Sequence, residues 1–357
     1  MAKYYSLSHS FYHNSLVEDR MKRNYLKLFL FNVLLLMLFL IGCSREDAVY
    51  TGERFEERLG AYTFGALLDL DDYEIMQFEF NGEKIEIPYH VEGLADNVIS
   101  EFGWFLFVDG LPQPTQLESF DGEIVSEKSY MHHFSLGYRE REEFYVVFSP
   151  VSGEMGGRVG LIAGSIFKPS FLPEDVNEPA FSPFHSLITT LPSEVMINNE
   201  VNGDFIAYRV SHLQPIDEKI LVEEQRRAEN EGIGFNDFLS FRSRIGLFPK
   251  ERGIELNYED ILKAENGFIN LTLLVYGGQE ISSRITFFLN HEPVQINNGA
   301  DFIEVSMEHG QMALIDVTLE IEDDMELGSL YALMMATRDE YENQDIFKTT
   351  TLLVVNE

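Results

Sequence analysis

Short segments in which hydrophobic and polar residues alternate recur along most of the chain. In segment 85–91 every second residue is hydrophobic, and Glu, Pro and His stand between them. This is the pattern of a strand with one buried face. Segments 104–108 and 285–289 are largely apolar runs, typical of strands in the middle of a sandwich. Asp109-Gly110 follows the first run and is a strong turn signal. The pattern predicts a protein built mainly of short β-strands.

The strand pattern occurs twice, in the same order and at nearly the same offset. The three matching pairs are 81–93 with 266–277, 104–113 with 285–295, and 166–168 with 346–348. Their offsets are 266 − 81 = 185, 290 − 109 = 181 and 346 − 166 = 180 positions. Three matches in one order indicate an internal repeat, with one domain present in two copies.

The fold class that we predict is mainly β, with two immunoglobulin-like β-sandwich domains related by this repeat. Six or seven strands in about 100 residues suit such a sandwich, and the two copies are placed at residues 68–173 and 260–357. Between them, residues 174–259 contain spaced prolines and a charged, helix-forming stretch from Asp217 to Glu231. We expect a small α/β insert there.

The N-terminal region carries the most specific motif of the chain. Lys22, Arg23 and Lys27 precede an apolar run over 28–41, which is too short for a comfortable membrane span and suits a signal peptide. The run ends in Leu40-Ile41-Gly42-Cys43, and Cys43 is the single cysteine of the chain. This segment resembles the lipobox of bacterial lipoprotein precursors.

The resemblance implies lipidation of the Cys43 thiol and cleavage after Gly42. Residues 1–42 are then a signal peptide, for which we expect translation to start at Met21, and residues 43–67 are a lipidated tether. The protein would be extracytoplasmic, held by lipid on the outer face of the cytoplasmic membrane or, in a Gram-negative cell, on the outer membrane. The alternative is a short N-terminal anchor that is never cleaved.

Charge and cysteine content exclude several classes of function. The formal net charge is −34, from 60 acidic and 26 basic residues, and such a field repels nucleic acid. A single cysteine excludes an internal disulfide framework, a cysteine-based zinc site and a CxxC redox motif. We expect no nucleic-acid partner and no cofactor.

The sequence predicts no catalytic residue and no metal ligand. Acidic clusters at 69–74 and 320–326 have oxygen ligands suited to calcium but lack EF-hand spacing, so we interpret them as solvated turns and strand edges. His132 and His133 are adjacent, so on a strand they point to opposite faces and do not easily share a metal. A GxSxG nucleophile motif is absent from the sequence.

Aromatic residues in the expected loops are the remaining candidates for a binding site. Trp104 lies in an apolar run and is assigned to the core, whereas exposed rings can stack on sugars or anchor a partner. The loop candidates are Tyr130, Phe171, Phe181 and Phe184.

The function that this sequence favours is non-catalytic binding or scaffolding in the cell envelope, with a protein partner. The first alternative is recognition of a glycan or another small ligand, which needs an aromatic-lined groove. The second is a hydrolase of cell-wall or other polymer, which needs two converging carboxylates.

Overall fold

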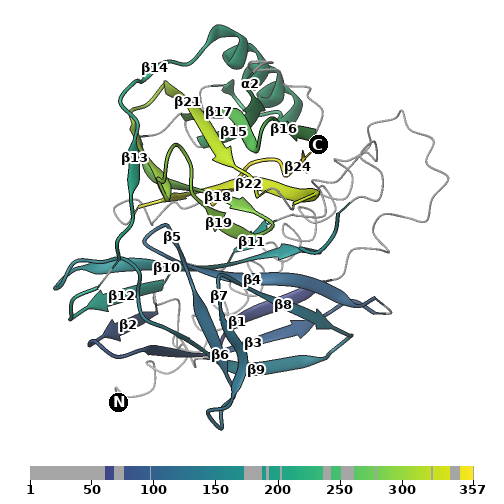
Figure 1. Cartoon of the computed structure of the whole chain (residues 1–357), viewed down its shortest axis with the longest axis vertical. Coiled ribbons are helices and arrows are strands. Elements are labelled where there is room, and N and C mark those ends of the chain that lie inside the picture. Colours follow the sequence, from purple (N-terminus) through teal and green to yellow (C-terminus); the bar gives the residue numbers. More distant parts are fainter. Residues whose placement is uncertain are drawn as a thin grey trace, which may run out of the picture. The chain divides into compact units, whose positions relative to one another are not determined.

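The chain folds into two β-sandwiches, which we call the first and the second sandwich (Figure 1). The computed structural model describes residues 61–67, 76–96, 98–172, 187–189, 193–201, 203–235, 243–250, 261–277, 280–322, 325–337 and 346–356. The mainly β fold class and the paired sandwiches predicted from the sequence are confirmed. In the described ranges, no helix is long and apolar enough to cross a membrane.

The first sandwich consists of a five-stranded and a seven-stranded sheet. The five-stranded sheet has the order β1 (Tyr62–Ala66), β3 (Ile85–Gly93), β9 (Arg141–Phe148), β6 (Thr115–Glu118), β7 (Ile124–Ser129). The main path of the other sheet is β2 (Gln77–Phe80), β12 (Ser193–Ile197), β10 (Arg158–Phe167), β4 (Ser100–Val108), β5 (Leu111–Gln113). Strand β11 (Leu187–Thr189) also pairs with β10, and β8 (Met131–Leu136) pairs with β4.

The second sandwich consists of an eight-stranded and a four-stranded sheet. The main path of the larger sheet is β13 (Ala207–Arg209), β20 (Phe302–Met307), β18 (Ile281–Leu289), β22 (Leu327–Ala336), β24 (Leu352–Asn356), β16 (Ile261–Ala264). Strands β19 (Glu292–Val294) and β23 (Phe347–Lys348) extend it beside β18 and β22. The smaller sheet has the order β14 (Gln214–Pro215), β21 (Gln311–Glu320), β17 (Phe268–Gly277), β15 (Ser243–Pro249).

Strand pairing shows the internal repeat directly. Strand β12 pairs in parallel with β2 and antiparallel with β10, and β24 pairs in the same way with β16 and β22. The turn residues Asp109 and Asn290 correspond, because Asp109 N–H donates to Gly160 O and Asn290 N–H to Ser329 O. Both have positive φ, 51° and 49°, so the two copies share a left-handed turn at this position.

One of the three sequence matches is wrong. The segment 166–168 begins in β10, whose counterpart is β22, whereas 346–348 contains β23, whose counterpart is β11. The error arose because a three-residue match of Ile-Phe-Lys carries no information about strand pairing.

The strand pairing also differs from the domain boundaries predicted from the sequence. Strand β1 lies inside the stretch 43–67 assigned to the tether, yet it pairs along its whole length with β3. In the expected α/β insert, 174–259, strands β11 and β12 belong to the first sandwich, and β13, β14 and β15 belong to the second. These strands are short or irregular in pattern, so only their pairing reveals their membership.

The stretch Asp217–Glu231 forms the helix that its composition predicts. In α2 (Glu218–Glu231), Asp217 accepts a hydrogen bond from Lys219 N–H, and Gly232 ends the helix in the left-handed conformation at φ 68°. Ile216, Ile220 and partly buried Leu221 pack against Phe248, Leu274, Tyr276 and Met312 of the smaller sheet. The helix therefore covers the outer face of the second sandwich.

A hydrophobic cluster and polar contacts join the two sandwiches. Phe105 and Phe107 of β4 pack against Phe288 of β18 and Tyr331 of β22. Beside them, Arg284 Nη1 donates 2.6 Å hydrogen bonds to both Asp109 O and Asp109 Oδ2. Strand β4 is consequently buried on both faces, since Trp104 and Leu106 point into the core of the first sandwich.

Candidate functional site

An apolar pocket of about 410 Å³ lies inside the first sandwich, lined by residues from both of its sheets. Its inner wall consists of buried residues from β3, β4, β9, β10 and β12, including Ile87, Leu106 and Val146. The lining residues of β1 and β2 other than Tyr62, including Phe64 and Phe78, are half-buried. Since β1 and β2 are edge strands of the two sheets, the pocket lies at the edge of the sandwich between them. Its size is that of ordinary small-molecule sites, about 300–1,000 Å³.

Comparison with the second sandwich shows which residues differ at the pocket. Ala66 of β1 pairs with Tyr89, and Leu247 of β15 pairs with Leu273 in the same register. Ala66 therefore stands where the second sandwich has Leu247, which is fully buried in its core.

A second small residue lines the pocket at a position where the second sandwich has a leucine. Ser193 of β12 pairs with Leu161, and Leu352 of β24 pairs with Leu330 in the equivalent register. Ser193 lines the pocket, whereas Leu352 is 0% exposed in the second core. Two core leucines of the second sandwich are thus an alanine and a serine in the first, and space remains at their positions.

Two aromatic residues with polar atoms replace aliphatic residues in the pocket wall. Tyr89 corresponds to Leu273, and Trp104 to Ile285, because Trp104 pairs with Ser165 as Ile285 pairs with Met334. The rings of Tyr89 and Trp104 meet edge to face, with centroids 5.2 Å apart at 62°.

The polar atoms of this aromatic pair have no hydrogen-bond partner among the described residues. Tyr89 Oη and Trp104 Nε1 are both buried, in residues that are 6% and 0% exposed. Burial raises the pKa of Tyr89, and the indole N–H lies near enough to offset part of that rise. The two groups lack good hydrogen-bond geometry, and both polar atoms are buried away from the interior of the pocket.

A third aromatic residue of the wall is fully paired. Tyr62 Oη lies 2.7 Å from Ser165 Oγ, and the Tyr62 ring stacks on Phe102 at 3.8 Å. Burial raises the pKa of Tyr62, and the bond to Ser165 lowers it by less. Tyr62 therefore forms a fixed part of the wall and has no free polar group to offer.

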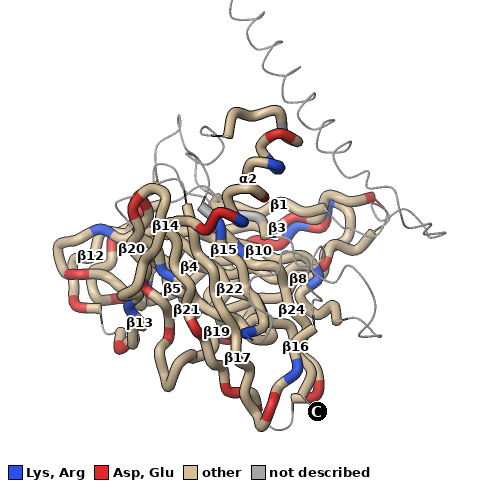
Figure 2. The backbone as a smooth tube through the Cα atoms, turned by 90° about the horizontal axis from the view of Figure 1, so that it is seen from above, with Lys and Arg blue, Asp and Glu red and all other residues tan. Residues whose placement is uncertain are grey.

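The described lining contains no Asp, Glu, His, Lys or Arg. Elsewhere in the described ranges, no group of three or more His, Cys, Asp or Glu side chains is placed to hold a metal ion. Figure 2 shows acidic positions on many separate strands and turns. Of the acidic clusters noted in the sequence, 69–74 and Asp323-Asp324 lie outside the described residues.

Neither Tyr130 nor Phe171, the aromatic candidates that the structure describes, lines this pocket. Tyr130 is half-buried beside a small cavity of about 90 Å³, together with Leu111, Pro293 and Asp301. Burial raises the pKa of Tyr130, with smaller contributions from Glu292 and Asp301. Since this cavity is lined by residues of both sandwiches, Tyr130 lies at their junction and is not an exposed platform.

Of the other predicted site residues, the structure describes only Phe171. Phe171 is half-buried, and its N–H donates to Lys168 O. Phe181, Phe184 and the lipobox residues Leu40, Ile41, Gly42 and Cys43 lie outside the described residues.

The two adjacent histidines lie on opposite faces of β8, as predicted. His132 is 2% exposed, and its ring lies 2.9 Å from Thr115 Oγ1 and 2.8 Å from Ser126 Oγ, whereas His133 is exposed. Burial lowers the pKa of His132 to about 4. Its role is that of a neutral core residue.

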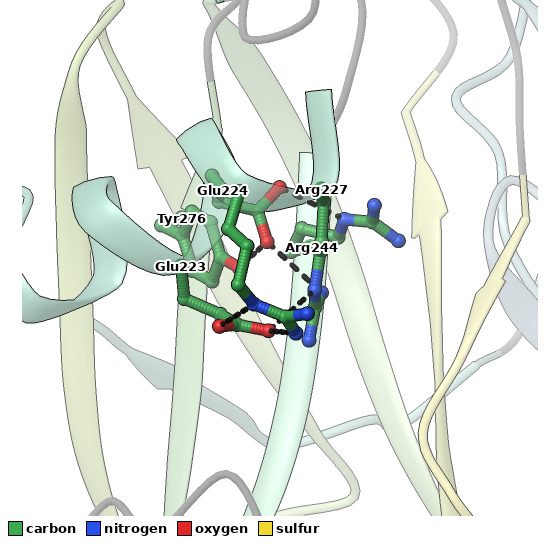
Figure 3. A network of polar contacts seen from close by, with 6 residues as sticks. Glu223, Glu224, Arg227, Arg244 and Tyr276 are labelled. Carbon is green, nitrogen blue, oxygen red and sulfur yellow. Dashed lines mark hydrogen bonds and ion pairs between the residues drawn. The ribbon is translucent and has the colours of Figure 1, made fainter. Parts of the chain in front are cut away.

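The other polar cluster surrounds the buried carboxylate of Glu224, a residue of α2 (Figure 3). Glu224 is 1% exposed and accepts hydrogen bonds from Tyr276 Oη at 3.0 Å and Arg227 Nη1 at 2.9 Å. Arg244 Nε of β15 lies 3.6 Å from its second oxygen. Burial raises the pKa of Tyr276, with a further contribution from Glu224. The cluster fastens the helix to the sheet, and its carboxylate is fully engaged.

Sequence reasoning missed the pocket because Trp104 was assigned only to the core. It is a core residue that also belongs to the lining of the pocket. The repeat alignment already placed Trp104 opposite Ile285, and that aromatic-for-aliphatic difference was the available signal.

No protein-family model and no curated protein matches this chain. Among solved structures, it is similar to the CARDB domain of a Pyrococcus furiosus protein in complex with di-metal ions. That match has 13% identity and a TM-score of 0.21, covering 32% of this chain and 92% of that one.

Two further structures match over more of the chain. The calcium-binding domain CBD12 of CALX1.1 has 11% identity and a TM-score of 0.18, over 78% of this chain and 96% of that one. A protein of unknown function from Porphyromonas gingivalis has 10% identity and a TM-score of 0.22, over 83% and 99%. TM-scores at this level carry no information about function.

Proposed function

We propose that this chain is a non-catalytic binding protein whose first sandwich receives a small apolar ligand. The observation that carries the proposal is the pocket of about 410 Å³, present where Ala66 and Ser193 replace the core leucines of the second sandwich. Natural cores are close-packed, so a space of this size with aromatic walls favours a ligand. Of the alternatives drawn from the sequence, the pocket favours small-ligand recognition.

The test is to fill the pocket with the residues of the second sandwich. Ala66→Leu combined with Ser193→Leu should abolish fluorescence enhancement of the neutral apolar probe N-phenyl-1-naphthylamine while thermal unfolding remains cooperative. Ser135→Leu, on the exposed face of β8, adds the same side chain outside the pocket and should leave probe binding unchanged. Equal probe binding by all variants would contradict the proposal.

The envelope location remains part of the proposal and rests on the lipobox resemblance. Lipid on Cys43 would hold the protein at the membrane, where apolar compounds concentrate. Cys43→Ala should abolish incorporation of a radiolabelled palmitate, and Ser44→Ala, at the neighbouring position, should retain it. Palmitate labelling of the Cys43→Ala variant would exclude the lipoprotein assignment.

A protein partner remains the second candidate, because the first sandwich has an exposed apolar hairpin. Strands β6 and β7 have no counterpart between β19 and β20 of the second copy. Phe120, Ile124 and Val125 at this hairpin are 49%, 54% and 52% exposed, and β7 is an edge strand. Cross-linking in intact cells should recover one envelope protein, and Phe120→Ser with Ile124→Ser should lose it.

Catalysis is not part of the proposal. A glycoside hydrolase needs a pair of carboxylates flanking the scissile bond. The described wall of the pocket offers aromatic, aliphatic, hydroxyl and thioether side chains and no carboxylate.

A further inference from the structure

We propose that the ligand is a single-chain amphiphile, whose hydrocarbon chain lies along β1 inside the first sandwich while its polar head stays in solvent at the edge. This inference rests on the proposed function, because it names the class of ligand for the same pocket. The observations that carry it are the extent of the pocket along β1, the uncharged character of its described lining and its position at an edge of the sandwich.

The pocket extends along the whole of β1. All five residues of this strand, Tyr62–Ala66, belong to its lining. A strand rises about 3.3 Å per residue, so this part of the lining is about 13 Å long. An extended backbone advances about 3.4 Å for every three bonds, and an extended hydrocarbon chain is similar, so the length suits a chain of about twelve carbon atoms.

The walls on either side of this length are apolar and close to each other. Ile87 and Val146 of one sheet and Leu106 and Ala163 of the other are buried in the lining. Facing sheets pack about 10 Å apart, and side chains from both sheets occupy most of that separation. The space that remains between them suits a flexible chain better than a compact system of fused rings.

The described lining has no partner for a charged head group. It contains no Asp, Glu, His, Lys or Arg, and a buried charge without a partner is costly. The hydroxyl group of Tyr62 is already paired with Ser165. The polar head of the ligand therefore belongs outside, where the pocket lies between the edge strands β1 and β2.

A free amphiphile suits the pocket better than the lipid that we propose on Cys43. A membrane holds a single hydrocarbon chain only marginally and reversibly, so a single-chain molecule can exchange between a bilayer and the pocket. Lipid that anchors a protein stably has its chains buried in the bilayer already, and it gains little from moving into another apolar space.

The experiment measures how affinity depends on chain length in alkyl glucosides, which share one neutral head. Octyl, decyl, dodecyl and tetradecyl glucoside are titrated below their micelle concentrations into the whole chain carrying Cys43→Ser, so that no attached lipid competes. Binding is measured by calorimetry. We expect the affinity to rise about fourfold for each added CH₂ group and to level off near dodecyl glucoside, whose chain fills the length of the pocket.

A compact ligand and two variants provide the controls. Adamantyl glucoside has as many carbon atoms as decyl glucoside in its apolar part, arranged as a cage. After correction for partition between octanol and water, it should bind about tenfold more weakly, because a misfit in an apolar pocket is costly. Ala66→Leu, at one end of β1, should weaken binding of dodecyl glucoside more than that of octyl glucoside. Ser135→Leu, on the exposed face of β8, should leave both unchanged.

The outcomes separate this inference from the proposed function. Equal corrected affinities of the decyl and adamantyl compounds, or no binding of any glucoside, would overturn the chain assignment. Binding of N-phenyl-1-naphthylamine would in either case leave the apolar pocket standing. Absence of binding for the glucosides and for that probe would overturn the proposed function and this inference with it.

Discussion

Ala66 and Leu247 occupy the same position in the two copies of the sandwich, yet only Leu247 fills its core. Ala66 is half-buried beside the pocket, and Leu247 is 0% exposed. Ala66 pairs with Tyr89 of β3, and Leu247 pairs with Leu273 of the corresponding strand β17. The repeat therefore provides a natural comparison between a packed and an unpacked form of one architecture.

Exchanging these residues should change stability in opposite directions. Leu247→Ala removes a fully buried side chain and should lower the free energy of unfolding by about 3 kcal/mol. Ala66→Leu places apolar atoms in existing space and should keep or raise stability, by up to about 1 kcal/mol. Urea denaturation of both variants checks this. A loss of about 3 kcal/mol in Ala66→Leu would mean that the space is closed in solution.

The contact between Asp109 and Arg284 should couple the two sandwiches. Their side chains are 15% and 17% exposed, and Arg284 Nη1 lies 2.6 Å from Asp109 Oδ2. Asp109→Asn removes the charge and tolerates the φ of 51°, so it should cost about 1–2 kcal/mol. A double-mutant cycle with Arg284→Met should give a coupling energy of about 1 kcal/mol or more. Additive effects of the two substitutions would show that the pair contributes nothing specific.

Removing the charge of Glu224 should increase local unfolding of α2 more than unfolding of the rest of the molecule. Glu224→Gln removes the buried negative charge that pairs with Arg227 and Arg244 and should cost about 2 kcal/mol. Tyr276→Phe removes a single hydrogen bond and should cost about 1 kcal/mol. Hydrogen exchange over residues 218–231 should accelerate more in the first variant. Glu223→Gln, which alters the more exposed neighbouring carboxylate, is the matched control.

Mild acid should destabilise the protein through two buried histidines, His132 of β8 and His291 of the turn between β18 and β19, which is 6% exposed. Burial lowers the pKa of His132 and that of His291 to about 4, from about 6.5 in the unfolded chain. The unfolded state then binds protons first, so stability is complete above pH 6.5 and falls as the pH drops towards 4. The loss is up to about 3 kcal/mol for each histidine.

Single substitutions separate this effect from that of the many carboxylates. His132→Gln and His291→Gln should each flatten the dependence of unfolding free energy on pH between 6.5 and 4.5. His133→Gln should flatten it less, because His133 is more exposed and burial lowers its pKa to a smaller extent. An unchanged slope in His132→Gln would show that this ring titrates normally in the folded state.

Much of the fold could be predicted because alternation and repetition are local properties of a sequence. Segment 85–91 alternates clearly and forms part of β3, and the Asp109-Gly110 turn was recognisable from two residues. Strand membership could not be predicted in the same way. Strand β12 has the burial pattern of any half-buried strand, and only its parallel pairing with β2 assigns it to the first sandwich.

The candidate site was less predictable, because a pocket is an absence of side-chain volume. Neither Ala66 nor Ser193 is unusual in a strand, and each becomes informative only beside Leu247 or Leu352. Finding those counterparts requires the register of β1 against β15 and of β12 against β24. The loop aromatics were plausible by composition, but Tyr130 lies at the junction of the sandwiches instead.

The parallel pairing of β12 with β2 also determines when the pocket forms during folding. Asn198, directly after β12, donates a 2.9 Å hydrogen bond to Asn81, which lies 117 positions earlier. Contacts at such separation form late in folding, because a long loop must close first. Ser193 lies on that same strand, so the pocket receives its last wall only when the whole first copy has been synthesised. The proposed ligand capture therefore requires the chain through β12 and does not require the second copy.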